Sequence, residues 1–219
     1  MILKVLRQDR PDYDYRDGVT LHLFTPQDLA HLEGRVLAND AGWYQGIARD
    51  GYEQRPFDTQ AQANWAFFPL HPMLWRGLQA LGLSPLASGL LLANLLFFVA
   101  LVQLHRWVQV QWDRGLADRA VLCLALFPTS HFFSMPWTES LFAALLATAL
   151  LAMARRRWGE MAGIALLASG TRSVGVLLAP LLAWQARRDP DATPAQRWLY
   201  PALALGGLIA FMALLWAKT

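Results

Sequence analysis

The sequence predicts an all-α protein: a polytopic bundle of transmembrane helices with re-entrant or broken helices and an interfacial first outer loop. Hydrophobic residues make up 55% of the 219 residues and charged residues only 16%, against about 25% charged in ordinary soluble domains. Four runs carry no charged side chain when His131 is neutral, at 77–104, 120–138, 140–154 and 198–217. A membrane-spanning helix needs roughly 20 apolar residues. The longest runs meet that length, and the shorter ones fit helices that cross as a pair; a soluble helical core is the disfavoured alternative.

The predicted layout has three parts. Residues 1–38 form a polar N-terminal segment without a signal peptide, because Lys4, Arg7 and Asp9 interrupt its apolar positions. Residues 39–83 form a non-cytoplasmic loop with interfacial helices, and residues 84–219 form the transmembrane helical bundle, which is expected to be incomplete. The helices of this bundle are predicted at about 84–105, 117–134, 137–154, 159–185 and 198–217.

Three arginine clusters set the predicted orientation, because positively charged loops lie on the cytoplasmic side of a membrane. All three share one side only if residues 159–185 form a re-entrant hairpin with residues 170–173 at its tip. The alternative is one continuous span, which is disfavoured because it leaves Arg172 alone near mid-bilayer. In both arrangements residues 39–83 and the turn at 128–136 share the non-cytoplasmic face. The clusters are Arg106, Arg114 and Arg119; Arg155, Arg156 and Arg157; and Arg187, Arg188 and Arg197.

The first candidate for chemistry is Asp40, which stands beside Trp43 and Tyr44 in the outer loop. A carboxylate next to the membrane surface can act as a general base that takes a proton from an attacking hydroxyl. The structural alternative is that Asp40 caps a helix that runs from about Ala41 to Asp50. Taken alone, the pattern favours the cap.

Two further segments add polar groups on the same face. His71 lies between two prolines in a turn that leads into an amphipathic helix, and a lone histidine is more often structural than catalytic. Glu139 begins an apolar helix, where the helix dipole stabilises a carboxylate. It can instead contact substrate in a water-filled cavity, with His131 as an additional donor.

The last candidate is Arg172, which interrupts an apolar stretch. A buried guanidinium needs an anion, and a phosphate fits because guanidinium binds it through two hydrogen bonds. A helix that follows Ser173 would also point its positive end toward that phosphate. The alternative is an ion pair with Glu139 or Asp40, and the sequence leaves both open.

Composition excludes several other classes of protein. The single Cys123 permits no disulfide framework. The net charge of +3 is small and forms no basic stripe with interleaved aromatic residues, which argues against a nucleic-acid partner. Nucleotide-binding glycine loops, paired-cysteine motifs, metalloprotease motifs and serine-hydrolase motifs do not occur.

Four segments together resemble a known family. They are residues 40–52 (DAGWYQGIARDGY), 66–72 (AFFPLHP) and 132–142 (FFSMPWTESLF), and Thr171-Arg172 before an apolar run. Their order and spacing resemble the mannosyltransferase family of glycosylphosphatidylinositol anchor assembly (second mannose) and its bacterial relatives, in the C-type glycosyltransferase superfamily. The resemblance covers roughly residues 38–185.

The resemblance implies a multi-pass enzyme of the bacterial inner membrane or an equivalent endomembrane. It would transfer a sugar, expected to be mannose, from a polyprenyl- or dolichyl-phosphate donor to an acceptor hydroxyl on the non-cytoplasmic face, with inversion. Asp40 occupies the position of the family's expected base. Arg172 would stabilise the leaving phosphate, and Glu139 would orient sugar or acceptor hydroxyls. The remaining residues expected to bind substrate are His71, His131, Trp43 and Tyr44.

No cofactor is expected besides the lipid-linked donor, because no cluster with metal-ligand spacing occurs. The expected partners are the bilayer, the polyprenyl-phosphate sugar and a partner membrane subunit. Residues 1–38 lack the membrane helix that relatives carry before the Asp40 loop, and relatives continue past position 219, so the chain is expected to be truncated at both ends. His71 also replaces an aromatic hydroxyl that is usual in the family. The competing interpretation is a degenerate, non-catalytic subunit or a transporter-like module with Arg172 as its anion site.

Overall fold

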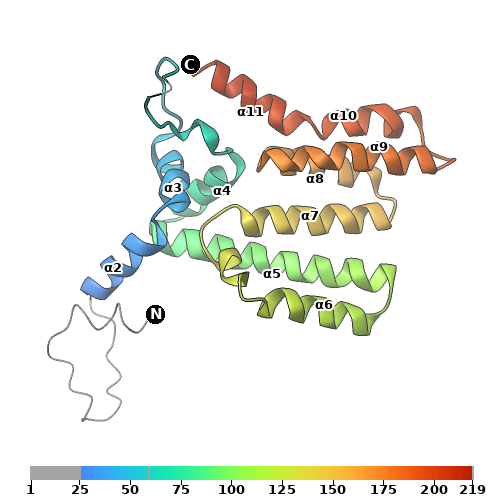
Figure 1. Cartoon of the computed structure of the whole chain (residues 1–219), viewed down its shortest axis with the longest axis horizontal. Helices are drawn as coiled ribbons and strands as arrows, with labels where there is room; N and C mark the ends of the chain where they lie inside the picture. The colour runs from blue at the N-terminus through green and yellow to red at the C-terminus, as the bar shows by residue number, and fades with distance from the viewer. Residues whose placement is uncertain (1–25, 59, 219) are drawn as a thin grey trace, which may run out of the picture. The chain divides into compact units, whose positions relative to one another are not determined.

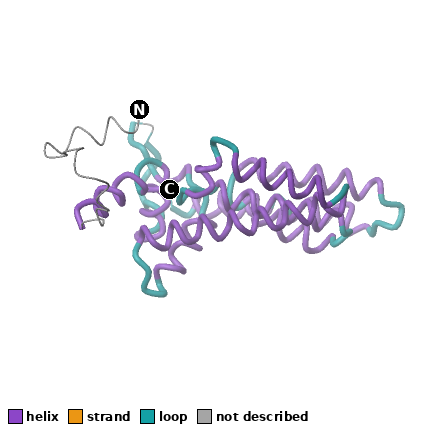
Figure 2. Tube along the Cα trace, turned by 90° about the horizontal axis from the view of Figure 1, so that it is seen from below, coloured by secondary structure: helices purple, strands orange, loops and turns teal. Residues whose placement is uncertain are grey.

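The structure is a computed structural model that describes residues 26–58 and 60–218, and these residues contain helices and loops but no strand. Residues 34–219 form one compact unit, in which helices run side by side (Figure 1, Figure 2). The predicted polar segment 1–38 lies largely outside the described residues; its described part contains α2. The α-helices are α2 (Pro26–Val36), α3 (Asp40–Asp50), α4 (Leu70–Gln79), α5 (Pro85–Gln111), α6 (Arg114–Leu126), α7 (Glu139–Ala154), α8 (Trp158–Ser169), α9 (Leu178–Arg188), α10 (Tyr200–Leu203) and α11 (Gly206–Trp216). Short helical turns are η1 (Asn64–Ala66), η2 (Ser130–Ser134), η3 (Ser173–Leu177) and η4 (Ala195–Leu199).

Local sequence signals set both ends of the α5–α6 pair. The Ser84 side chain caps α5 by accepting a hydrogen bond from the Ala87 amide at 3.2 Å, and Pro85 occupies the first helical position, where its missing N–H does no harm. The prediction of a helix over 117–134 is wrong at its C-terminal end, because α6 stops at Leu126. Phe127 precedes Pro128 and adopts an extended conformation (ψ 138°), which is the conformation that a following proline favours.

The stretch 159–185 is a hairpin rather than one continuous helix. It consists of α8, a break at residues 170–172, and then η3 and α9. Met161 and Ala165 of α8 share one buried cluster with Leu178 and Leu182 of α9, so the two arms pack on each other. Figure 1 shows α8 and α9 side by side. The hairpin expected from the arginine pattern is therefore confirmed as a feature of the fold.

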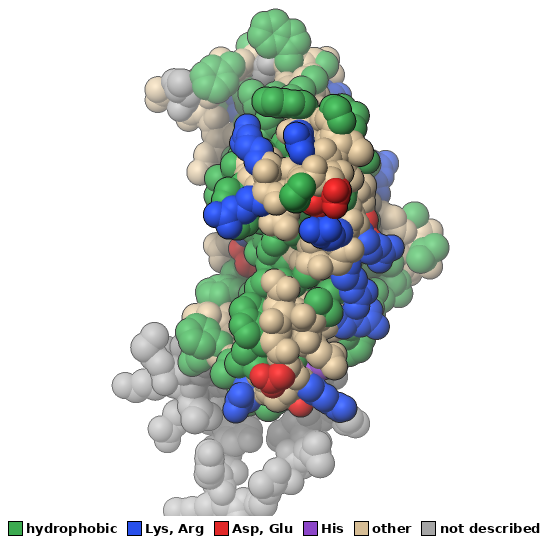
Figure 3. Space-filling model, turned by 90° about the vertical axis from the view of Figure 1, so that its right-hand side faces the viewer, with side chains coloured by type: hydrophobic (Ala, Val, Ile, Leu, Met, Phe, Trp, Pro, Cys, Tyr) green, Lys and Arg blue, Asp and Glu red, His purple; other side chains and the backbone are tan. Residues whose placement is uncertain are grey.

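The predicted arginine clusters gather at one end of the helical unit. Arg156 Nη2 lies 3.7 Å from Asp189 Oδ1, which joins the end of α7 to the end of α9. Figure 1 places the ends of α5, α7 and α9 on the right-hand side, and Figure 3 shows that blue side chains crowd this end. All nine arginines of the three clusters are exposed. The tip of the hairpin, α3 and α4 lie toward the other end (Figure 1).

Among the residues that the structure describes, two helical stretches are long and apolar enough to cross a membrane, Pro85–Gln111 and Ala195–Trp216, whereas α7 is shorter. At 1.5 Å per residue α5 is about 40 Å long, which exceeds the roughly 30 Å of a bilayer core. The last stretch begins close to the predicted residue 198, but it is interrupted at residues 204–205 between α10 and α11. Length and composition thus support two spans, and the polytopic bundle that the sequence predicts is not confirmed.

Two glycines bring the backbone of the hairpin close to its neighbours. A Cβ on Gly175 would overlap the backbone of Ala168 at the end of α8, and a Cβ on Gly207 would overlap the backbones of Leu166 and Gly170. Gly207 also donates its amide hydrogen to Ser169 Oγ at 3.1 Å. These contacts fix the position of the break that carries Arg172.

We expect Gly175→Ala and Gly207→Ala each to destabilise the protein by about 1–3 kcal/mol, because the added methyl group must displace backbone rather than a mobile side chain. The midpoint of thermal unfolding of the purified protein measures this effect. Gly163→Ala on α8 is the matched control, since a Cβ there meets nothing within 4 Å, and it should be neutral or slightly stabilising. Equal midpoints for all three variants would contradict the proposed close packing.

Candidate functional site

Helix α3 positions the first group of candidate residues. Its buried residues Ala41, Tyr44, Ile47 and Ala48 follow the spacing of one helical face, and Tyr44 and Ala48 pack with Trp75 and Leu92 in one buried cluster. Asn39, rather than Asp40, holds the cap position, with a positive φ of 55° and no side-chain cap hydrogen bond. Asp40 is the first residue of the helix, where the dipole stabilises its charge.

Trp75 anchors the outer helices on α5. It is fully buried, and its indole N–H donates to Ser88 Oγ at 2.9 Å and to the Pro85 carbonyl at 3.1 Å. Gly89 makes room for the ring, because a Cβ there would lie 2.5 Å from Trp75 and 2.9 Å from Pro136. The turn that precedes α7 is thereby held against α4 and α5.

Side chains from three distant segments meet around the hydroxyl of Thr138. The Tyr44 hydroxyl of α3 lies 3.4 Å from Thr138 Oγ1. From the break in the hairpin, Arg172 Nη1 donates to Thr138 Oγ1 at 3.1 Å and to Glu139 Oε1 at 2.6 Å. The side chains of Arg172 and Glu139 remain 40% and 32% exposed. The ion pair between Arg172 and Glu139, one of the two partners left open by the sequence, is confirmed.

Asp40 lies on the edge of this group. Asp40 is exposed, and its negative charge acts on the phenol of Tyr44. Burial is the main cause that raises the pKa of Tyr44; the hydrogen bond to Thr138 and the charge of Arg172 oppose this rise, and the charges of Glu139 and Asp40 add to it. Tyr44 is therefore a neutral hydroxyl at ordinary pH, influenced by all three charged candidates.

The two histidines have different surroundings. His71 is fully buried, with its ring edge-on to Tyr44 at 5.1 Å and to Trp75 at 5.7 Å between centroids. Neither of its ring nitrogens has a hydrogen-bond partner among the described residues, and burial lowers its pKa to about 4. His131 is exposed, and its ring lies against that of Phe132 with 4.1 Å between centroids and 36° between planes. The contacts described for His131 do not join it to the Thr138 group.

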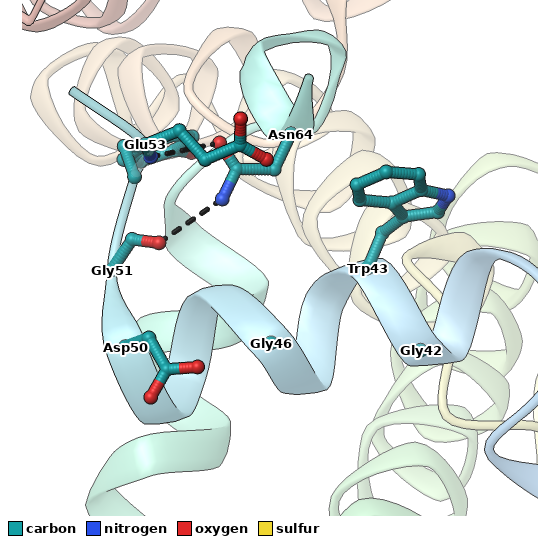
Figure 4. A pocket seen from close by; sticks show the side chains of 8 residues that line it. Gly42, Trp43, Gly46, Asp50, Gly51, Glu53 and Asn64 are labelled. Carbon is teal, nitrogen blue, oxygen red and sulfur yellow. Dashed lines mark hydrogen bonds between the residues drawn. The ribbon is translucent and has the colours of Figure 1, made fainter. Parts of the chain in front are cut away.

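Trp43 faces a pocket of about 350 Å³ on the side of α3 (Figure 4). Its indole is stacked on Phe67, with 5.7 Å between centroids and 17° between planes. The pocket is lined by Gly42, Trp43, Gly46, Asp50, Gly51, Tyr52, Glu53 and Asn64. Of these residues only Trp43 was predicted from the sequence.

Sequence reasoning also missed Thr138, although it lies within a segment that carries the family resemblance. Its position directly before the first residue of α7 was the available signal, because a hydroxyl there normally caps the helix, and Thr138 makes no such cap hydrogen bond. Within residues 26–58 and 60–218, no three His, Cys, Asp or Glu side chains are grouped so that they could hold a metal ion.

The low pKa of His71 predicts that the protein loses stability in acid. The unfolded state takes up this proton near pH 6.5, whereas the folded state does so near pH 4. The stabilisation is therefore present above pH 6.5 and is lost as the pH falls to 4, by at most about 3 kcal/mol. His71→Phe should reduce the slope of unfolding free energy against pH in that window. His131→Phe, the same replacement at an exposed histidine, is the control for the substitution itself; an unchanged slope in His71→Phe would contradict the prediction.

Comparison with known families places this geometry in context. The family described as mannosyltransferase (PIG-V) matches residues 29–187, a range that includes Asp40, Tyr44, Thr138, Glu139 and Arg172. Searches of curated proteins and of solved structures found no match. Since the matched residues make up well over half of the chain, the protein belongs to the mannosyltransferase (PIG-V) family.

Proposed function

We propose that the protein transfers mannose from a polyprenyl- or dolichyl-phosphate donor to an acceptor hydroxyl on the non-cytoplasmic face of a membrane, with inversion at the sugar. Membership of the mannosyltransferase family supports glycosyl transfer with mannose. The observation that carries the rest is the meeting of Arg172, Glu139, Thr138 and Tyr44 at the end of the helical unit away from the arginine clusters.

Arg172 is the proposed phosphate ligand. Both of its described hydrogen bonds come from Nη1, so the other guanidinium N–H groups can bind a phosphate oxygen without breaking them. The ion pair with Glu139 and the bond to Thr138 hold the guanidinium in one orientation. A fixed cation at the leaving phosphate stabilises charge that develops in the transition state, because no reorganisation is needed as the bond breaks.

Asp40 is the proposed general base. The acceptor oxygen attacks the anomeric carbon from the face opposite the phosphate, and a new C–O bond forms as the bond to the phosphate oxygen breaks. The electron pair of the broken bond leaves with the lipid phosphate, and the acceptor proton passes to the Asp40 carboxylate. Glu139 is engaged by Arg172 at one carboxylate oxygen, which suits it to orienting sugar hydroxyls, whereas Asp40 is exposed and can receive the proton.

The proposed location is a membrane with the arginine end in the cytoplasm. The two long apolar stretches support this placement, and so does the exposure of all nine clustered arginines at one end. Between them α7 and the hairpin of α8 and α9 would enter the bilayer, with Arg172 near the opposite surface. In this arrangement a lipid phosphate in the outer leaflet reaches Arg172 while its sugar remains in water.

The direct test compares wild type with Asp40→Asn in membranes supplied with radiolabelled polyprenyl-phosphate mannose. Loss of the base is expected to lower transfer by about 10²–10⁴-fold without releasing the protein from the membrane. Asp191→Asn is the matched control, because Asp191 is an exposed carboxylate in the loop at the arginine end, and it should transfer as wild type does. Full transfer by Asp40→Asn removes the proposed base, and absence of transfer by wild type favours a non-catalytic or transporter-like protein.

Arg172→Lys tests the second role. Lysine keeps the charge but cannot bond Thr138, Glu139 and a phosphate from one planar group, so transfer should fall at least tenfold, with the larger loss in kcat. Arg188→Lys is the control, since Arg188 stacks on Trp184 at the other end, 4.2 Å from the ring centroid. Equal kcat in Arg172→Lys and wild type would show that the guanidinium does not act on the leaving group.

A further inference from the structure

The floor of the pocket beside α3 is formed by glycines, which have no side chains. Gly42 and Gly46 are one turn apart on the same face of the helix, and a Cβ on Gly46 would meet nothing within 4 Å. Glycine within a helix lowers its stability by about 1 kcal/mol relative to alanine. Packing does not require a glycine at position 46, so the open space above Gly46 calls for another explanation.

The pocket has an aromatic wall at one end. Figure 4 shows the Trp43 indole standing on one side of Gly46, with Glu53 and Asn64 on the other. Trp43 is held by its stack on Phe67, whose carbonyl accepts a 2.5 Å hydrogen bond from the Tyr52 hydroxyl. The indole is thus a fixed flat surface rather than a mobile side chain.

The polar wall is also fixed. Asn64 is buried; its Oδ1 accepts from the Glu53 amide at 3.1 Å, and its Nδ2 donates to the Gly51 carbonyl at 3.0 Å. The Glu53 carboxylate receives a 2.9 Å hydrogen bond from Arg55 Nε at one oxygen only. Glu53 thus lines the pocket with one carboxylate oxygen that Arg55 Nε does not bond.

This combination selects a class of ligand. The carboxylates of Asp50 and Glu53 line the pocket, and each is paired with an arginine, Asp50 with Arg49 at 2.7 Å and Glu53 with Arg55 at 2.9 Å. The paired charges largely cancel, which suits a neutral ligand better than a phosphate. A neutral ring with apolar C–H groups on its face and hydroxyls on its rim fits both walls, because the face covers the indole and the hydroxyls donate to carboxylate oxygens in strong charge-assisted bonds. A volume of about 350 Å³ suits a ligand at the small end of the usual range of about 300–1,000 Å³.

We propose that this pocket, lined by Trp43, Gly46, Glu53 and Asn64, is the acceptor subsite and that it binds a sugar ring of the acceptor. The assignment to the acceptor rests on the proposed function, because Asp40 lies one helical turn before Trp43 on α3, whereas the donor phosphate is assigned to Arg172. A sugar stacked on Trp43 would therefore lie close to the proposed base.

The test measures sugar binding directly and requires no transfer. Saturation-transfer NMR on the purified full chain uses methyl α-D-mannopyranoside as the probe and glycerol, an open-chain polyol, as the comparison. Wild type should transfer saturation to the pyranoside ring protons and at least tenfold less to glycerol. Gly46→Leu fills the pocket and should abolish the signal, whereas Gly77→Leu, a matched helical glycine on α4 with nothing within 4 Å of its Cβ, should keep it.

Trp43 provides a second test that does not depend on how leucine fits. Trp43→Ala should weaken binding of the probe at least tenfold, and Trp43→Phe, which keeps an aromatic face, should restore most of it. An equal signal in wild type and Gly46→Leu, or no signal in wild type, overturns the subsite. If the signal depends on Gly46 and Trp43 but Asp40→Asn transfers normally, the sugar site stands and the proposed base fails, so the two proposals are separable.

Discussion

The tie between Arg172 and the first turn of α7 is the interaction on which the site depends. Arg172 lies where the hairpin is broken, in an extended conformation with φ −151° and ψ 146°, and so its side chain leaves the direction of both helices. Its bonds to Glu139 and Thr138 connect segments that are more than 30 positions apart in sequence. Removal of either charge would leave the other without its partner in a half-buried place, which is more costly than loss of a surface ion pair.

Small residues make this tie possible. Alanines of α7, α8 and α9 fill much of the core around Met161 and Leu182, and Gly175 and Gly207 allow backbones to approach more closely than any side chain would permit. Such close approach is the usual means by which helices associate in a membrane, where no hydrophobic force drives them together. The same contacts leave little freedom at the tip of the hairpin, so Arg172 is held in place by the backbone as well as by its partners.

Much of the fold could be predicted from charge and proline positions. Counting arginines at the helix ends was enough to favour a hairpin, since only a return of the chain brings Arg187 to the side of Arg156, and the ion pair of Arg156 with Asp189 agrees with this. The prediction that α6 reaches residue 134 was wrong because the apolar run continues past Pro128, whereas the helical backbone does not. The break at residues 204–205 was missed for the same reason: the apolar run is continuous there, and the contact of Gly207 with α8 is tertiary.

The sequence predicted which residues belong to the site better than it predicted how they are arranged. Tyr44, Glu139 and Arg172 meet as a group, but Thr138 joins them only because Trp75 and Gly89 fix the preceding turn. His131 was included for its chemistry, and its ring instead contacts that of Phe132 at an exposed position. The pocket could not be foreseen, since it is defined by side chains that Gly42 and Gly46 do not have, and sequence gives no direct measure of empty space.

The distribution of charge gives the two carboxylates different properties. Glu139 shares its charge with Arg172 at 2.6 Å, and this pair is close to neutral as a unit, while Asp40 stands exposed at a helix start. In the proposed transfer, a phosphate at Arg172 would be bound by a guanidinium that is already partly neutralised, which would limit ground-state affinity for the donor. The charge on the phosphate oxygen would become larger and more localised as the sugar left, and Arg172 would stabilise it more strongly than the charge of the intact diester. Under that proposal, an arginine moderated by Glu139 would favour the transition state over the bound substrate, which is the condition for a binding group to raise kcat.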